Sequence, residues 1–172
     1  MRRFGAVFRS AYGQAGSGNR YFPAHEVEAV RGRRAKKVLV FGVFDGLHEG
    51  HRAFLRQARR LGTLFVAVAL DSAVRKMKER SPRYALRRRI AHVRKEGLAE
   101  KVIPGDLVPS SYAVVLRHKP HVIALGYDQK KLLKDLMRNL HRFRPRPKLK
   151  ILRAHKPKRY HSRFFGGNRS RG

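Results

Sequence analysis

The chain contains no cysteine among its 172 residues. This absence excludes disulfide bonds, catalysis by a thiolate and zinc sites built from cysteine. Acidic residues are also scarce, with 11 against 42 lysines and arginines, and the formal net charge is +31. No apolar run approaches the roughly 18 residues that a transmembrane helix needs. The sequence therefore predicts a soluble, cytoplasmic protein that does not enter a membrane.

The excess of positive charge has two interpretations, a nucleic-acid partner or a basic composition distributed over solvated surfaces. Basic residues are dispersed along the chain, with concentrations at 31–37, 56–60, 75–94 and 142–163. Dispersal favours the second interpretation. It still leaves nonspecific attraction of nucleic acid as a consequence of the charge.

The first 36 residues differ in pattern from the rest. They are basic and contain several glycines, which weaken any amphipathic helix. We expect residues 1–36 to form a flexible extension, with a short helix near 23–31; an organellar transit peptide is the alternative. Residues 37–163 are expected to form one domain, long enough to bury a core, and 164–172 a basic tail.

Strands and helices alternate along the expected domain. Continuous apolar runs predict strands covered on both faces, and apolar residues three and four apart predict helices. The strands are expected at 37–43, 64–70, 102–105, 121–126 and 148–152, and the helices at 49–61, 85–96, 111–118 and 130–141. No element is assigned to the basic segment 75–78. The alternation predicts an α/β fold, with a doubly wound, mostly parallel sheet in a single domain.

A glycine- and histidine-rich turn follows the first strand and leads directly into a helix. Glycines let the backbone approach a ligand, and the start of a helix offers N–H groups and a positive dipole to an anion. His48 and His51 would lie beside that anion. A pair of polar turn residues is one alternative. A zinc site is another, for which two histidines without a third ligand are weak evidence.

The carboxyl ends of parallel strands share one edge of a sheet, where ligands bind. Asp45, Asp71 and Asp128 each follow a predicted strand, so they should converge there with the two histidines. This combination suggests nucleotidyl transfer, in which a phosphate attacks the α-phosphorus of a nucleoside triphosphate. Catalysis then consists of positioning and electrostatic stabilisation, and no protein nucleophile is needed.

The turn carries the pattern GxFDxxHxGH, formed by Gly42, Phe44, Asp45, His48, Gly50 and His51. This pattern resembles the signature of the cytidylyltransferase-like nucleotidyltransferases, whose HxGH motif binds the triphosphate. Segments 69–78 and 125–129 resemble the ARDxxVxKxKG and LGxDQ segments of archaeal-type FAD synthases, and 156–162 is similar to their closing segment. The resemblance implies a Rossmann-like fold and transfer of AMP from ATP to FMN, assisted by Mg²⁺ or another divalent cation.

The resemblance also implies roles for individual residues. Catalytic roles fall on His48, His51 and Lys78. Nucleotide contacts are expected from Val43, Phe44, Asp45, Gly50, Gly126, Asp128 and Ser162. Phosphate contacts are expected from Arg87 and Lys156, a metal or substrate contact from Asp71, and no structural metal is expected. The alternatives are surface cations for Lys78 and Arg87, a turn role for Asp128 and helix capping for Asp71.

Other functions stay open at this point. One is a CTP-dependent cytidylyltransferase acting on a phospho-alcohol, although the closing Ile-Ser-Thr-Thr run of the glycerol-3-phosphate enzymes is absent. Another is an RNA-binding or ribosome-associated protein on a retained nucleotidyltransferase fold. Relatives often pair as homodimers. One departure from the FAD synthase pattern is Arg163, which stands where the closing segment has a second serine.

Overall fold

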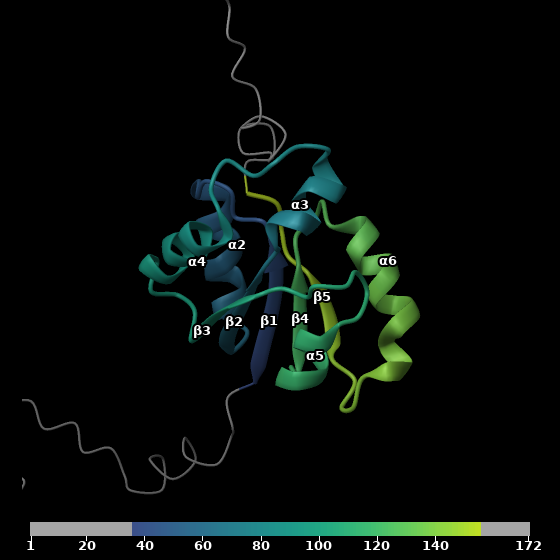
Figure 1. Cartoon of the computed structure of the whole chain (residues 1–172). Helices are drawn as coiled ribbons and strands as arrows, with labels where there is room; N and C mark the ends of the chain where they lie inside the picture. The colour runs from purple at the N-terminus through teal and green to yellow at the C-terminus, as the bar shows by residue number, and fades with distance from the viewer. Residues whose placement is uncertain (1–35, 156–172) are drawn as a thin grey trace, which may run out of the picture. The chain divides into compact units, whose positions relative to one another are not determined.

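The computed structural model describes residues 36–155 (Figure 1). Its strands are β1 (Lys37–Gly42), β2 (Thr63–Val68), β3 (Lys101–Pro104), β4 (Val122–Leu125) and β5 (Lys148–Ile151). Its helices are α2 (Glu49–Arg59), α3 (Asp71–Lys78), α4 (Leu86–Lys95), α5 (Ala113–His118) and α6 (Lys130–Asn139), and the 3-10 turn η1 (Leu140–Arg142) follows α6. The helix expected near 23–31 lies outside the described residues.

The strands form one sheet in the order β3-β2-β1-β4-β5. All four neighbouring pairs are parallel, and central β1 pairs Val38 with Leu64 of β2 on one side and with Val122 of β4 on the other. The predicted doubly wound, parallel sheet is confirmed. The chain moves outward from β1 through β2 to β3 and then returns to place β4 on the opposite side of β1. The carboxyl ends of β1 and β4 therefore flank a topological switch point, where ligands bind in this class of fold.

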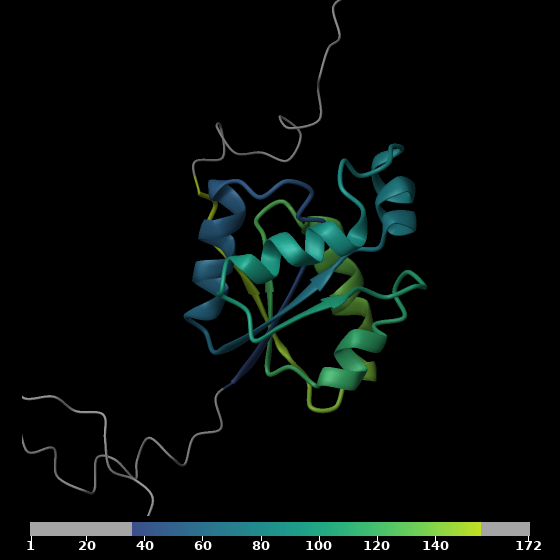
Figure 2. The same ribbon diagram turned by 60° about the vertical axis from the view of Figure 1, so that its left-hand side comes forward.

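Two apolar cores lie on the two faces of the sheet because side chains alternate along each strand. Val38 and Val40 of β1 pack with Leu55 of α2 and Ile90 of α4 in one core. Leu39 packs in the other core, which contains residues of α5 and α6. Figures 1 and 2 show α2 and α4 on one side of the sheet and α5 and α6 on the other. Both faces are covered, which accounts for the continuous apolar runs in the strands.

Helix α3 was not expected from the sequence. It contains eight residues, of which Val74 is the one that is buried. A helix anchored by a single apolar side chain has no repeating apolar stripe, so periodicity could not find it. Lys78 lies in its last turn. Figure 1 shows α3 above the carboxyl edge of the sheet.

Candidate active site

The histidine pair is held by the start of α2. His48 is the N-cap residue, with an extended backbone, and its Nδ1 accepts a hydrogen bond from the backbone N–H of His51 at 3.4 Å. The two imidazole rings are stacked, with centroids 3.8 Å apart. The same interaction that caps the helix therefore fixes both rings at its positive end.

Phe44 supports the pair from the core. Its side chain is 1% exposed, and the edge of its ring meets His51 at a centroid distance of 5.4 Å. Its backbone has φ = 52°, an unfavourable region for a bulky side chain. A Cβ on Gly42 would lie 2.6 Å from the Phe44 ring. Glycine at position 42 is therefore needed for Phe44 to turn under the histidines.

Burial keeps the two imidazoles neutral. It lowers the pKa of His51 to about 3, with further lowering from the neighbouring His48, Lys78 and Arg52, and a hydrogen bond with the Gly46 backbone opposes the change. Burial, followed by the charge of Arg52, also lowers the pKa of His48. In addition, His51 Nδ1 is buried and has no hydrogen-bond partner among residues 36–155. A buried ring nitrogen in this state is suited to a ligand that supplies the missing partner.

Lys78 joins three segments of the chain electrostatically. Its charge contributes to the lowered pKa of His51. Burial lowers the pKa of Lys78 itself, Arg80 adds to this effect, and Asp45 and Asp128 oppose it. Lys78 from α3, the histidine turn after β1 and Asp128 after β4 therefore lie within electrostatic reach of one another. The structure brings these predicted site residues together at the carboxyl edge of the sheet.

The turn after β4 is attached to β1 through Gln129. The side chain of Gln129 accepts a hydrogen bond from the N–H of Gly126 at 2.8 Å and donates one to the carbonyl of Phe41 at 2.9 Å. A Cβ on Gly126 would lie 2.9 Å from a carboxylate oxygen of Asp128, so a larger residue would disturb this turn. Asp128 is exposed. These contacts hold it next to the end of β1, at the switch point.

The carboxylate of Asp45, from which a nucleotide contact is expected, is held by hydrogen bonds within the protein. Its two carboxylate oxygens accept hydrogen bonds from the backbone N–H groups of Arg83 and Tyr84, at 2.8 and 2.9 Å. The carboxylate thus holds the loop that leads into α4. Asp45 binds these groups because the loop brings two N–H donors to the end of β1.

Asp71 likewise binds the protein. One oxygen accepts from the N–H of Leu86 at 3.3 Å and the other from the guanidinium of Arg89 at 2.5 Å. Burial opposes ionisation, but these hydrogen bonds and the charge of Arg89 lower the pKa of Asp71 overall. This geometry favours the capping alternative, since Leu86 is the first residue of α4, over the metal or substrate contact.

Arg89 is a site residue that the sequence reasoning missed. It is fully buried, and its guanidinium donates to the carbonyls of Tyr84, Val43 and Ala69 at 2.9, 2.6 and 2.7 Å, besides its bond to Asp71. One side chain therefore ties together the ends of β1 and β2 and the loop before α4. Val43, from which a nucleotide contact is expected, is one of the residues that hold Arg89, because its carbonyl accepts a hydrogen bond from the guanidinium.

The charge of Arg89 predicts a position on the solvent side of α4 beside Arg87 and Arg88, but the residue is buried. Its spacing contained the opposite signal, because it lies three residues after Leu86 and four before Val93, on the apolar face. Charge alone favoured the exposed assignment.

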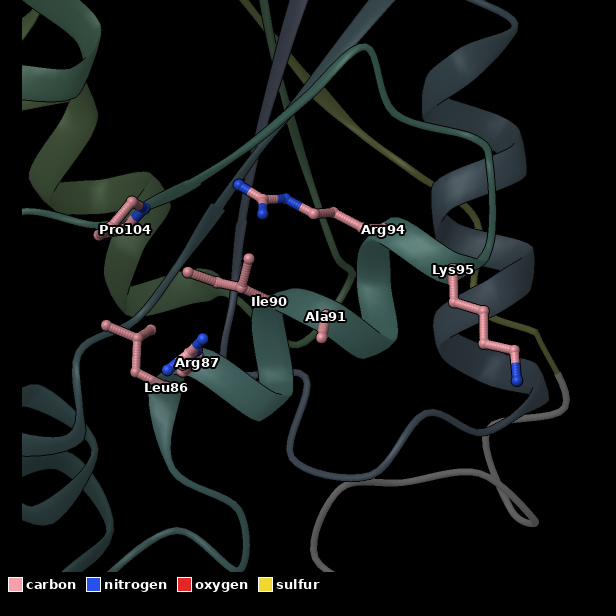
Figure 3. Close-up of a pocket in the computed structure, with 7 residues that line it drawn as sticks. All are labelled: Leu86, Arg87, Ile90, Ala91, Arg94, Lys95 and Pro104. Atoms are coloured by element: carbon pink, nitrogen blue, oxygen red, sulfur yellow. The ribbon is translucent and has the colours of Figure 1, made fainter.

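The other predicted contacts divide into three cases. Gly50 lies in the first turn of α2, beside the histidines. Arg87 is exposed on α4 and lines a hollow against β3, shown in Figure 3, on a different helix from the histidine pair. Ser162 and Lys156 lie outside the described residues.

No group of three or more histidine, aspartate or glutamate side chains among residues 36–155 is arranged to hold a metal ion. No helix in the same range is long and apolar enough to cross a bilayer.

The fold and the site together define a nucleotide-binding α/β protein of Rossmann-like type, with a histidine turn at the start of a helix. Residues 39–159 match the family model described as "Cytidylyltransferase-like". The chain belongs to this family.

Several relatives of the chain carry the name FAD synthase. The protein of Pyrococcus abyssi is 39% identical over 113 residues, which are 63% of this chain and 76% of that protein. The protein of Korarchaeum cryptofilum is 41% identical over 98 residues, which are 55% of this chain and 65% of that protein.

Among solved structures, the lipopolysaccharide core biosynthesis protein of Thermoplasma volcanium is similar, with a TM-score of 0.65 and 29% identity. The match covers 71% of this chain and 99% of that one. A pantoate-beta-alanine ligase from Francisella tularensis, with a TM-score of 0.51 and 12% identity over 80% of this chain and 70% of that one, shares the fold.

Proposed function

We propose that the protein is an FMN adenylyltransferase, which transfers AMP from ATP to FMN and releases pyrophosphate. The observation that carries this proposal is the stacked histidine pair at the start of α2, within electrostatic reach of Lys78. The FAD synthase relatives, at about 40% identity, support the choice of ATP and FMN. The catalytic unit would be the predicted domain 37–163, and the family match over 39–159 supports these limits.

In this mechanism the triphosphate of ATP lies against the first turn of α2. The backbone N–H groups of that turn and the helix dipole favour the anion. The imidazoles of His48 and His51 contribute as neutral hydrogen-bonding groups, because burial lowers the pKa of each. Bound phosphate charge would raise both pKa values and favour protonation as negative charge develops.

The chemical step is a displacement at phosphorus. An oxygen of the FMN phosphate forms a bond to the α-phosphorus of ATP. The bond between that phosphorus and the oxygen that bridges the α- and β-phosphates breaks. Pyrophosphate leaves with the electron pair. Lys78, which is partly buried, would neutralise charge on the transferring phosphates, where a desolvated cation acts more strongly than in water.

A divalent cation would enter as part of the ATP substrate. Mg²⁺ is usually held by substrate phosphates, water and one or two carboxylates. Both oxygens of Asp45 and of Asp71 already accept hydrogen bonds from the protein. Exposed Asp128, at the switch point, is the carboxylate that best fits this limited role. The residues present thus fit a cation carried by the nucleotide and do not form a cage for a resident metal.

The test is a substrate matrix with purified protein and Mg²⁺, in which ATP or CTP is combined with FMN or glycerol 3-phosphate. We expect FAD and pyrophosphate from ATP with FMN, and at least about a hundredfold less product from the other pairs. Preference for CTP with the phospho-alcohol would assign the chain to the alternative transferase. If the folded protein yields no product from any of these substrate pairs, the proposal that it is a nucleotidyltransferase is refuted.

A further inference from the structure

A shallow hollow of about 730 Å³ lies between α4 and the end of β3 (Figure 3), and no residue of the histidine turn lines it. Its floor is apolar, made by Leu86, Ile90, Ala91 and Pro104. Arg87, Arg94 and Lys95 complete its lining. It therefore combines an apolar floor with three cations.

The positive charge of α4 is not neutralised locally. Arg87, Arg88, Arg94 and Lys95 are exposed, and no carboxylate of residues 36–155 forms an ion pair with any of the four. Glu96, directly after the helix, is paired with Arg52 at 3.0 Å. Glu100 lies in the neighbouring hollow along β3, which Arg94 also lines. An anionic partner would supply the missing countercharge.

The arrangement of charge and apolar surface indicates the kind of anion. Arg87 and Arg94 are seven residues apart on one side of α4, a separation of roughly 10 Å along the helix axis. Cations along such a hollow can bind the phosphate backbone of a single nucleic-acid strand. The bases of the same strand can then cover the apolar surface between the cations. A duplex keeps its bases stacked inside and an acidic peptide has none to place there. We propose that the hollow along α4 and β3 binds single-stranded nucleic acid.

The hollow lies outside the histidine turn, and Arg87 is the one lining residue for which a phosphate contact in adenylyl transfer is also expected. The chain offers a matched pair of variants to test the proposal. Ala91 is exposed on the floor, so either a glutamate or a glutamine there meets solvent without disturbing the core. The two side chains have the same length and differ in charge. Ala91→Glu would place a carboxylate next to the bound phosphates, whereas Ala91→Gln would not.

The probe is a short fluorescent oligouridylate, and its anisotropy is measured with the full chain over a range of salt concentrations. We expect Ala91→Glu to bind at least about tenfold more weakly than Ala91→Gln, from Coulomb repulsion at the groove. Matching thermal unfolding midpoints would establish that both variants are folded. Equal affinity of the two variants would refute a binding site in the hollow.

A second comparison separates a site from diffuse attraction. The triple variant Arg87→Gln, Arg94→Gln, Lys95→Gln removes three charges from the hollow, and Lys130→Gln, Lys134→Gln, Arg138→Gln removes three from exposed positions on α6. Both keep the basic terminal segments. Each phosphate contact contributes about 0.7 to the slope of log K against log salt for single strands. The triple variant in the hollow should therefore lower the magnitude of this slope by about 2, and the triple variant on α6 should lower it much less.

Equal losses in the two triple variants would mean that net charge alone binds the strand, which overturns the proposal. Competitors that carry negative charge but no bases test whether the bases of the oligouridylate contribute to binding. Polyglutamate and inorganic polyphosphate should each compete more weakly per charge, because neither covers the apolar floor. If polyglutamate competes equally, the partner is an acidic peptide and the nucleic-acid assignment is wrong. If polyphosphate does so, the bases contribute nothing and the assignment is also wrong.

Discussion

Replacing His51 with asparagine should remove a specific loss of stability in acid. The pKa of His51 is about 3 in the folded protein, against 6.5 for an unperturbed histidine. Between these values the unfolded chain binds more protons than the native state, so the free energy of unfolding falls as the pH decreases. At about pH 5 the unfolded ring is mostly protonated and the native ring is not, which lowers stability by roughly 2 kcal/mol relative to about pH 7.

Urea unfolding of both proteins at the two pH values measures this contribution. The change between the pH values should be about 2 kcal/mol larger in the natural protein than in His51→Asn, since other titrating groups, including His48, are common to both. Saturating ATP should reduce the difference, because bound phosphate raises the pKa of the ring. Equal pH dependence in the two proteins would show that His51 is solvated and titrates normally, and the burial argument would be refuted.

Three further substitutions test the framework of the site. Arg89→Met leaves three carbonyls and Asp71 without their donor, so urea unfolding should show a loss of about 3–5 kcal/mol; a loss below about 1 kcal/mol would contradict the buried network. Gly42→Ala forces the Phe44 ring away, and kcat/KM for FAD formation should fall at least about tenfold; unchanged kinetics would show that Phe44 does not position the histidines. Lys78→Met should lower kcat about a hundredfold or more, with an unchanged unfolding midpoint; natural turnover would make Lys78 a surface cation.

The central strand–turn–helix unit could be predicted from the sequence because each part has a strong local signal. The apolar run of β1 required burial on both faces, and the glycines and helix start marked the ligand edge. The alternation of strands and helices predicted a parallel sheet covered on both faces, but it did not predict the order of the strands around β1. The family resemblance added the chemistry, which the pattern of apolar residues does not contain.

The contacts of the charged residues could not be predicted in the same way. A carboxylate at the end of a strand is equally suited to a ligand or to backbone N–H groups, and the choice depends on which loop lies nearby. Asp45 and Asp71 face donors from the segment 83–89, distant from each in sequence. Arg89 could be buried because four acceptors surround it, and no single stretch of sequence reveals all of them.

The fate of the three phosphates of ATP tests the account most directly. With Mg²⁺ and FMN present, ATP labelled at the α-phosphate should transfer its label to FAD, and ATP labelled at the γ-phosphate should release its label as pyrophosphate. His51→Asn should slow both transfers equally. Label from the γ-position in inorganic phosphate, or α-label that never reaches a flavin, would contradict attack by FMN at the α-phosphorus.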